Sequence, residues 1–155
     1  MLKFLALLFC CVFIQPCYAK QLTNIDYKQF PFEVEKHINE IVEDFSLYSQ
    51  NNGYDIYKIT FNECDNDSRM YIVLKNNEFT EVMFVNVTSE AEVITYNKIT
   101  ASLQVLGFSE EQSNKMLKEA IDFDSFFMWN EKELAYISLV RKEITNGYAF
   151  YILRT

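Results

Sequence analysis

Apolar side chains recur at helical spacing in the stretch between Phe32 and Gln50. The steps between them alternate between four and three, at Val34, Ile38, Ile41, Phe45 and Tyr48. Such a stripe predicts an amphipathic helix. Pro31 precedes it, where a first helical turn tolerates proline, and Asn51-Asn52-Gly53 follows it with residues that end helices. We therefore expect one helix over 32–50.

Three strand-like runs come next. They are rich in Tyr, Ile, Val and Phe and cover 54–61, 70–75 and 79–88. The polar stretch 62–68 separates the first two runs and is expected to be a loop. Asn76-Asn77 separates the last two and indicates a tight hairpin turn.

Helical periodicity returns after residue 90. Tyr96, Ile99, Leu103 and Leu106 again step by three and four, and Gly107 is placed to end that helix. Ser109 and Gln112 have the spacing of a capping box, which predicts a second helix running to about Ile121.

The C-terminal part has strand patterning over 126–129, 134–145 and 148–154. Asn146-Gly147 between the last two runs is a strong signal for a β-hairpin. The order is thus helix, three strands, one or two helices, three strands. This order predicts an α+β fold in which helices pack on one face of an antiparallel sheet.

The two halves of the chain, 30–88 and 90–155, align weakly at an offset of 65 residues. Phe61 then matches Phe126, and Tyr71-Ile72 matches Tyr136-Ile137. A duplicated helix-plus-three-strand unit explains the matches. Shared helix and strand periodicity also produces them, so both interpretations stay open.

Residues 1–19 have the layout of a secretory signal peptide. A basic start precedes the apolar run Phe4–Ile14, and small residues precede the junction of Ala19 and Lys20. The run is shorter than the roughly 18–20 residues that cross a bilayer as a helix. We expect cleavage after Ala19, export to the periplasm or the extracellular space, and no transmembrane anchor in the mature chain. The mature chain, 20–155, lacks a Pro-, Gly- or Ser-rich linker and is expected to be one domain.

Charge and cysteine content narrow the functional classes. The 155 residues include 14 basic and 22 acidic side chains, a net charge of −8, which disfavours non-specific nucleic-acid binding. Cleavage removes three of the four cysteines and leaves Cys64. An intramolecular disulfide is then excluded, and a dimer through an intermolecular Cys64 disulfide is one expectation.

The familiar catalytic and cofactor motifs are missing. No glycine-rich phosphate loop and no G-x-S-x-G turn occur, and His37 is the single histidine. A His and Cys metal site therefore lacks ligands, and a pair of Cys64 with His37 lacks a third group to orient it. We expect a non-enzymatic protein without a cofactor. Asn66 and Asn86 begin N-x-[ST] triplets, which matter only in a host that glycosylates.

Aromatic residues make up 16% of the chain and remain in excess. Strand alternation in the final hairpin places Tyr136 and a row with Tyr148 and Phe150 on one sheet face, and Tyr151 on the other. With Trp129, these residues are the candidate interaction surface. If helices cover only one face, the other is free to bind a partner. Burial of both faces is the alternative.

These observations favour an exported, non-catalytic binding protein of the inhibitor or immunity type. Its expected partner is another protein. A basic partner is favoured, because the chain itself is acidic and opposite charges attract. Two alternatives stay open. One is a small-molecule or lipid-binding module with an aromatic pocket between helix and sheet. The other is a hydrolase that uses the carboxylates of Glu63, Asp65 and Asp67.

Overall fold

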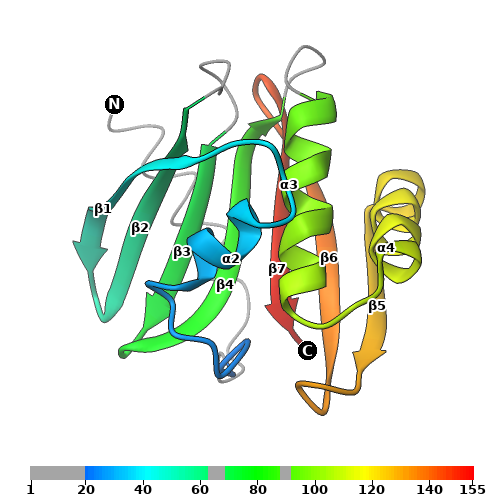
Figure 1. Cartoon of the computed structure of the whole chain (residues 1–155), viewed down its shortest axis with the longest axis horizontal. Helices are drawn as coiled ribbons and strands as arrows, with labels where there is room; N and C mark the ends of the chain where they lie inside the picture. Colours follow the sequence, from blue (N-terminus) through cyan, green and yellow to red (C-terminus); the bar gives the residue numbers. More distant parts are fainter. Residues whose placement is uncertain (1–19, 63–68, 88–91) are drawn as a thin grey trace.

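The computed structural model describes residues 20–62, 69–87 and 92–155. Its centre is a seven-stranded antiparallel sheet with the order β1-β2-β3-β4-β7-β6-β5 (Figure 1). The strands are β1 (Val42–Asn51), β2 (Tyr54–Phe61), β3 (Arg69–Lys75), β4 (Glu78–Val87), β5 (Ser125–Asn130), β6 (Ala135–Ile144) and β7 (Gly147–Arg154). Two meanders, β1 to β4 and β5 to β7, meet where β4 pairs with β7.

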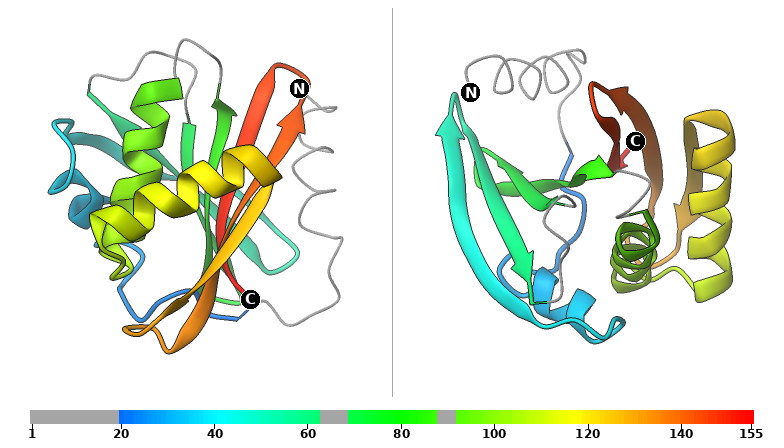
Figure 2. Two further views of the ribbon diagram at one scale, coloured as in Figure 1. Left: turned by 90° about the vertical axis from the view of Figure 1, so that its right-hand side faces the viewer. Right: turned by 90° about the horizontal axis from the view of Figure 1, so that it is seen from above.

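The described helices are α2 (Phe30–Glu35), α3 (Glu92–Val105) and α4 (Glu110–Phe123). The sheet curves around α2 and α3, which lie on its concave side, and α4 lies across β5 and β6 (Figure 2). We call the side of the sheet that contacts the helices the helix face and the opposite side the second face. The α+β fold, with helices packed on an antiparallel sheet, is confirmed.

The main core lies between the helices and the helix face. Phe30 of α2 meets Phe79 edge to face at 5.1 Å between ring centroids, and Phe84, Leu103 and Phe150 are fully buried. Burial of such side chains contributes about 1.5–3 kcal/mol each, before the cost of ordering the chain. The residues that the structure describes include no cysteine, so this core packs without a disulfide among them.

The predicted helix over 32–50 is wrong for everything after Glu35. The helix ends at Glu35, and the chain enters β1 at Val42. β1 is interrupted by register shifts between Val42 and Asp44 and between Leu47 and Ser49. These bulges disturb the period of two, so the less exposed positions of β1 fall at Val42, Phe45 and Ser49. Steps of three and four in a bulged strand imitate a helix.

The local turn and cap predictions hold. Asn76 and Asn77 have φ of 51° and 66° and join β3 to β4 in a tight turn, as expected. The β6–β7 hairpin is also formed, but its turn is shifted by one residue: Thr145 and Asn146 form the turn, and Gly147 pairs with Ile144 as the first residue of β7. The Ser109 and Gln112 capping box at the start of α4 is formed, with hydrogen bonds of 3.1 and 2.9 Å. By contrast, Asn52 and Gly53 do not end a helix: their φ of 50° and 79° form the β1–β2 turn.

In the part of the chain that the structure describes, no helix is both long and apolar enough to span a membrane.

Candidate functional site

Three exposed aromatic side chains lie together at the β5 end of the second face. Phe127 and Trp129 of β5 are 63% and 46% exposed, and Tyr136 of β6 is 48% exposed. The Tyr136 ring lies 5.7 Å from that of Phe127 and 5.2 Å from that of Trp129, both edge to face. We call these three residues the β5–β6 aromatic cluster. Edge-to-face contacts at this distance stabilise the arrangement by about 0.5–1.5 kcal/mol per pair.

Strand alternation brings the cluster together. Phe126 and Met128 point to the helix face and pack on the main core, so Phe127 and Trp129 point to the second face. In the β5–β6 ladder Trp129 lies opposite Tyr136, and Phe127 lies opposite the small side chain of Ser138. Tyr136 therefore sits beside both rings of β5. A large apolar surface is thus held on two paired strands rather than on a loop.

Polar groups border this part of the sheet. Asp124, just before β5, forms an ion pair with Arg141 at 2.9 Å, and the Arg141 guanidinium lies 4.5 Å from the centre of the Tyr148 ring. The Thr155 backbone N–H donates to the Tyr136 carbonyl, and the Thr155 and Ser138 hydroxyls are 2.5 Å apart. The C-terminus and a charged pair thus hold β6 in place beside the cluster.

The predicted surface residues separate in the structure. Trp129 and Tyr136 are exposed and adjacent. Tyr148 is partly buried against the main core, and Phe150 is fully buried in it on the helix face. Tyr151 points to the second face but is only 8% exposed, opposite Met83 of β4 and Val140 of β6. The predicted face assignment is wrong, because the β6–β7 register places Tyr136 on the face of Tyr151 and not on that of Tyr148 and Phe150. Phe150 and Tyr151 are also buried, one below the helices and the other at the centre of the sheet.

Phe127 was missed by sequence reasoning. The sequence does indicate Phe127, because residues two apart in a strand share a face and Trp129 is one of the predicted surface residues. Phe127 is the most exposed ring of the cluster. The binding surface suggested by the sequence thus moves from the last hairpin to β5 and β6.

The centre of the second face is buried and apolar. A cluster there, spanning β2, β3, β4 and β7, comprises Ile56, Tyr71, Met83, Val85, Ala149 and Tyr151. Glu81 of β4 lies on the same face between Val73 and Leu153. Burial raises the pKa of its carboxyl to about 7, although Lys142 lowers it in part. The centre of this face therefore differs from the β5–β6 end, where side chains are exposed.

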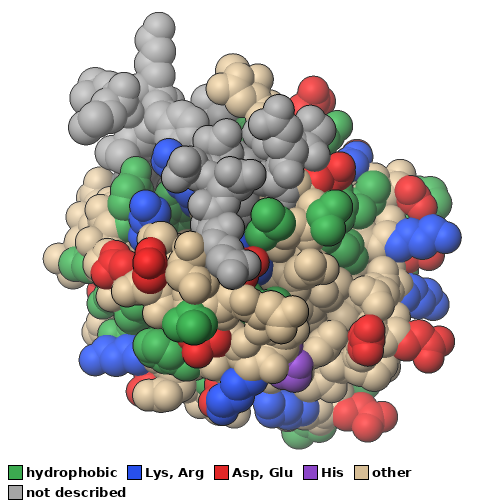
Figure 3. Space-filling model, turned by 45° about the horizontal axis from the view of Figure 1, so that its top comes forward, with side chains coloured by type: hydrophobic (Ala, Val, Ile, Leu, Met, Phe, Trp, Pro, Cys, Tyr) green, Lys and Arg blue, Asp and Glu red, His purple; other side chains and the backbone are tan. Residues whose placement is uncertain are grey.

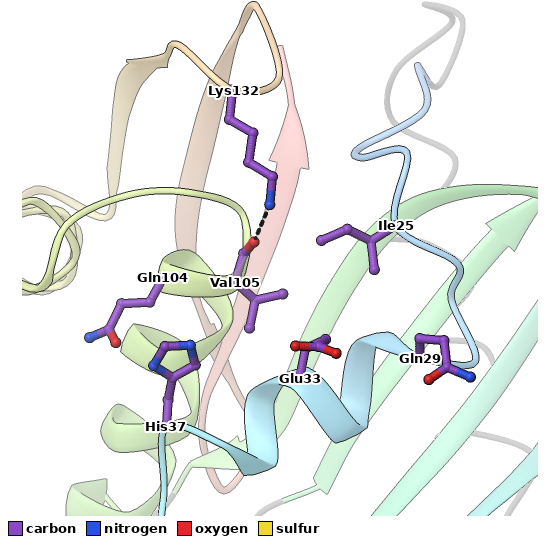
Figure 4. A pocket seen from close by; sticks show the side chains of 7 residues that line it. All are labelled: Ile25, Gln29, Glu33, His37, Gln104, Val105 and Lys132. Atoms are coloured by element: carbon purple, nitrogen blue, oxygen red, sulfur yellow. Dashed lines mark hydrogen bonds between the residues drawn. The ribbon is translucent and has the colours of Figure 1, made fainter.

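A cavity of about 400 Å³ lies between α2, the end of α3 and the turn after β5 (Figure 4). Its lining is mostly polar and comprises Ile25, Gln29, Glu33, His37, Gln104, Val105 and Lys132. The Lys132 ammonium donates to the Val105 carbonyl at 3.0 Å, and Glu33 pairs with Lys36 at 2.7 Å. The histidine reaches the surface (Figure 3). This cavity lacks the aromatic walls expected of a lipid-binding pocket.

Several sequence candidates fall outside the described residues. These are the signal segment 1–19, Cys64, Asn66, and the acidic residues Glu63, Asp65 and Asp67. Asn86 lies in β4, but its triplet ends at Thr88, which is also outside. Within the described ranges, no group of three or more His, Cys, Asp or Glu side chains is placed to hold a metal ion.

Comparisons with protein-family models, curated proteins and solved structures find no match for this chain.

Proposed function

We propose that this chain is an exported, non-catalytic binding protein of the inhibitor or immunity type that recognises a basic protein through the β5–β6 aromatic cluster. The observation that carries the proposal is the contact of three half-exposed rings on paired strands. Tyr and Trp are enriched at the centres of protein interfaces because they combine large apolar area with a polar tip. Export follows from the predicted signal peptide at 1–19.

The preference for a basic partner rests on the net charge of −8. Opposite net charges speed the encounter of two proteins, and salt screens that attraction. Association with the partner is therefore expected to slow as the salt concentration rises. The apolar contact of the rings, once made, depends much less on salt.

The test compares variants in affinity capture from the native envelope or secreted fraction. Trp129→Ser is expected to lose a protein that the wild type retains, by a factor of about 30 in affinity if Trp129 is a central contact. Leu47→Ser is the matched control, because Leu47 is 50% exposed on the outer strand β1 at the other end of the sheet.

The retained protein is then purified and titrated with each variant. Binding that is equal for wild type, Leu47→Ser and Trp129→Ser contradicts the proposal. Recovery of a small molecule rather than a protein would favour the alternative of a ligand-binding module.

A further inference from the structure

β5 is an outer strand that lacks two of the usual protections of a sheet edge, charged residues and bulges. Among the described strands it pairs with β6 alone, and its sequence Ser125–Asn130 contains no charged residue and no proline. Its register with β6 runs without a shift from Ser125 opposite Val140 to Asn130 opposite Ala135. Exposed strands in soluble proteins are usually shortened, bulged or charged to prevent pairing with other chains.

The other outer strand, β1, shows such protection. It carries Glu43 and Asp44 and is bent by two register shifts. Bulges and charges of this kind discourage the addition of a further strand. The absence of both devices from β5 is thus a local property of this edge and not of the whole sheet.

The sequence of β5 is self-complementary in an antiparallel pair. When Met128 lies opposite Met128 of a second copy, Phe127 lies opposite Trp129 of that copy, and the reverse pair forms by symmetry. Directly opposite residues of antiparallel strands share a face, so both aromatic pairs fall on the second face. No charged residue of one β5 opposes a charged residue of the other.

We propose that β5 pairs antiparallel with β5 of a second copy of this chain, joining two sheets into one. This inference rests on the proposed function and extends it, because the joined sheet unites two aromatic clusters into one partner-binding surface. α4 packs against β5 and β6, and Phe126 and Met128 of β5 join the main core on that side, whereas the proposed pairing uses the outer edge of β5. Because the pair involves one short strand per copy, the dimer is weak and depends on concentration.

Salt separates this contact from partner binding. Two copies with a net charge of −8 each repel one another, and salt screens the repulsion. Dimerisation therefore strengthens as salt rises, whereas association with a basic partner slows. The two processes respond to salt in opposite directions.

The test is analytical ultracentrifugation of the protein purified from the compartment in which it accumulates. It is run over a range of protein concentrations, at low and at high salt. Phe127→Lys places a charge at the centre of the edge and is expected to weaken the dimer by about tenfold or more. Leu47→Lys makes the same change on β1 and is expected to leave the dimer intact. Thermal unfolding of both variants verifies that they fold.

Two further variants separate the outcomes. Tyr136→Lys alters the aromatic cluster one strand away from the edge, so it is expected to lose the partner and keep the dimer. Cys64→Ser is expected to keep the dimer as well. A protein that stays monomeric at high salt, or a dimer that requires Cys64 or survives Phe127→Lys, overturns the inference without deciding the proposed function.

Discussion

The two outer strands of the sheet both carry exposed apolar side chains but arrange them differently. On β1, Leu47 and Tyr48 are 50% and 47% exposed, and the Tyr48 ring contacts Tyr71 at the buried centre of the second face. At the β5 end, three exposed rings contact one another. Contiguity of the rings, rather than exposure alone, distinguishes the candidate site.

The connections to these strands also differ. The segment before β1 is tied to α3 by a buried ion pair between Glu40 and Lys98 at 2.9 Å, with the Lys98 ammonium 4.8 Å from the centre of the Phe61 ring. The segment before β5 carries the ion pair of Asp124 with Arg141, in which Asp124 is 75% exposed. The ion pair next to the bulged strand β1 is thus buried, whereas the ion pair next to the straight strand β5 lies at the surface.

The largest expected effect tests this difference in anchoring. Lys98→Met keeps the apolar stem but leaves the Glu40 carboxylate without this ammonium, so it is expected to lower the free energy of unfolding by about 3 kcal/mol. Asp124→Asn keeps a residue that tolerates φ of 64° and is expected to cost less than about 1 kcal/mol. Urea unfolding measures both. Equal losses would show that the two anchors do not differ.

The second-largest expected effect concerns Glu81, at the centre of the second face between the outer strands β1 and β5. Glu81 has a pKa raised from 4.5 to about 7, so the folded state holds its proton more tightly than the unfolded state. Its contribution to stability is full below pH 4.5 and is lost as pH rises through 7. Glu81→Gln is expected to remove this loss and to stabilise the protein by about 2 kcal/mol at pH 8.

Thermal unfolding of wild type and Glu81→Gln between pH 4.5 and 8 measures that difference. The two stability curves are expected to separate as the pH rises. Parallel curves would mean that Glu81 is as well solvated in the folded protein as in the unfolded chain.

The smallest expected effect comes from a difference in backbone strain between the turns of the two meanders. The β1–β2 and β3–β4 turns use Asn and Gly at positive φ, whereas the β5–β6 connection places Leu134 at φ of 49° with its side chain 70% exposed. Leucine is strained there and glycine is not. Leu134→Gly is expected to raise the free energy of unfolding by about 0.5 kcal/mol, after the entropy of glycine in the unfolded chain is subtracted. A clear loss of stability in thermal unfolding would show that the Leu134 side chain makes contacts that outweigh the strain.

Features with a local cause were predictable from the sequence. The Asn76-Asn77 turn, the hairpin at Asn146-Gly147 and the capping box at Ser109 each depend on residues a few positions apart. The helix expected over 32–50 failed because its apolar stripe is not a buried face: Ile41 and Tyr48 are exposed, and bulges in β1 break the alternation that would have indicated a strand. A bulge depends on the partner strand, and the pattern of a single segment does not reveal it.

The site was predictable only in part, for a similar reason. Trp129 and Tyr136 were among the predicted surface residues, and Phe127 follows from Trp129 by strand alternation. The burial of Tyr151 depends on Met83 of β4, which joins β7 across more than sixty residues of sequence. The polar cavity likewise combines α2, α3 and the turn after β5, which only the fold brings together.

The most direct test of the binding account uses the fact that Trp129 is the single tryptophan of the chain. Labelling with 5-fluorotryptophan gives one ¹⁹F resonance, which reports on the surroundings of Trp129. Addition of the captured partner is expected to shift or broaden this resonance. When the two proteins are mixed at high salt, the same change is expected to develop more slowly. A resonance that stays unchanged while the partner binds would place the interface elsewhere and contradict the account.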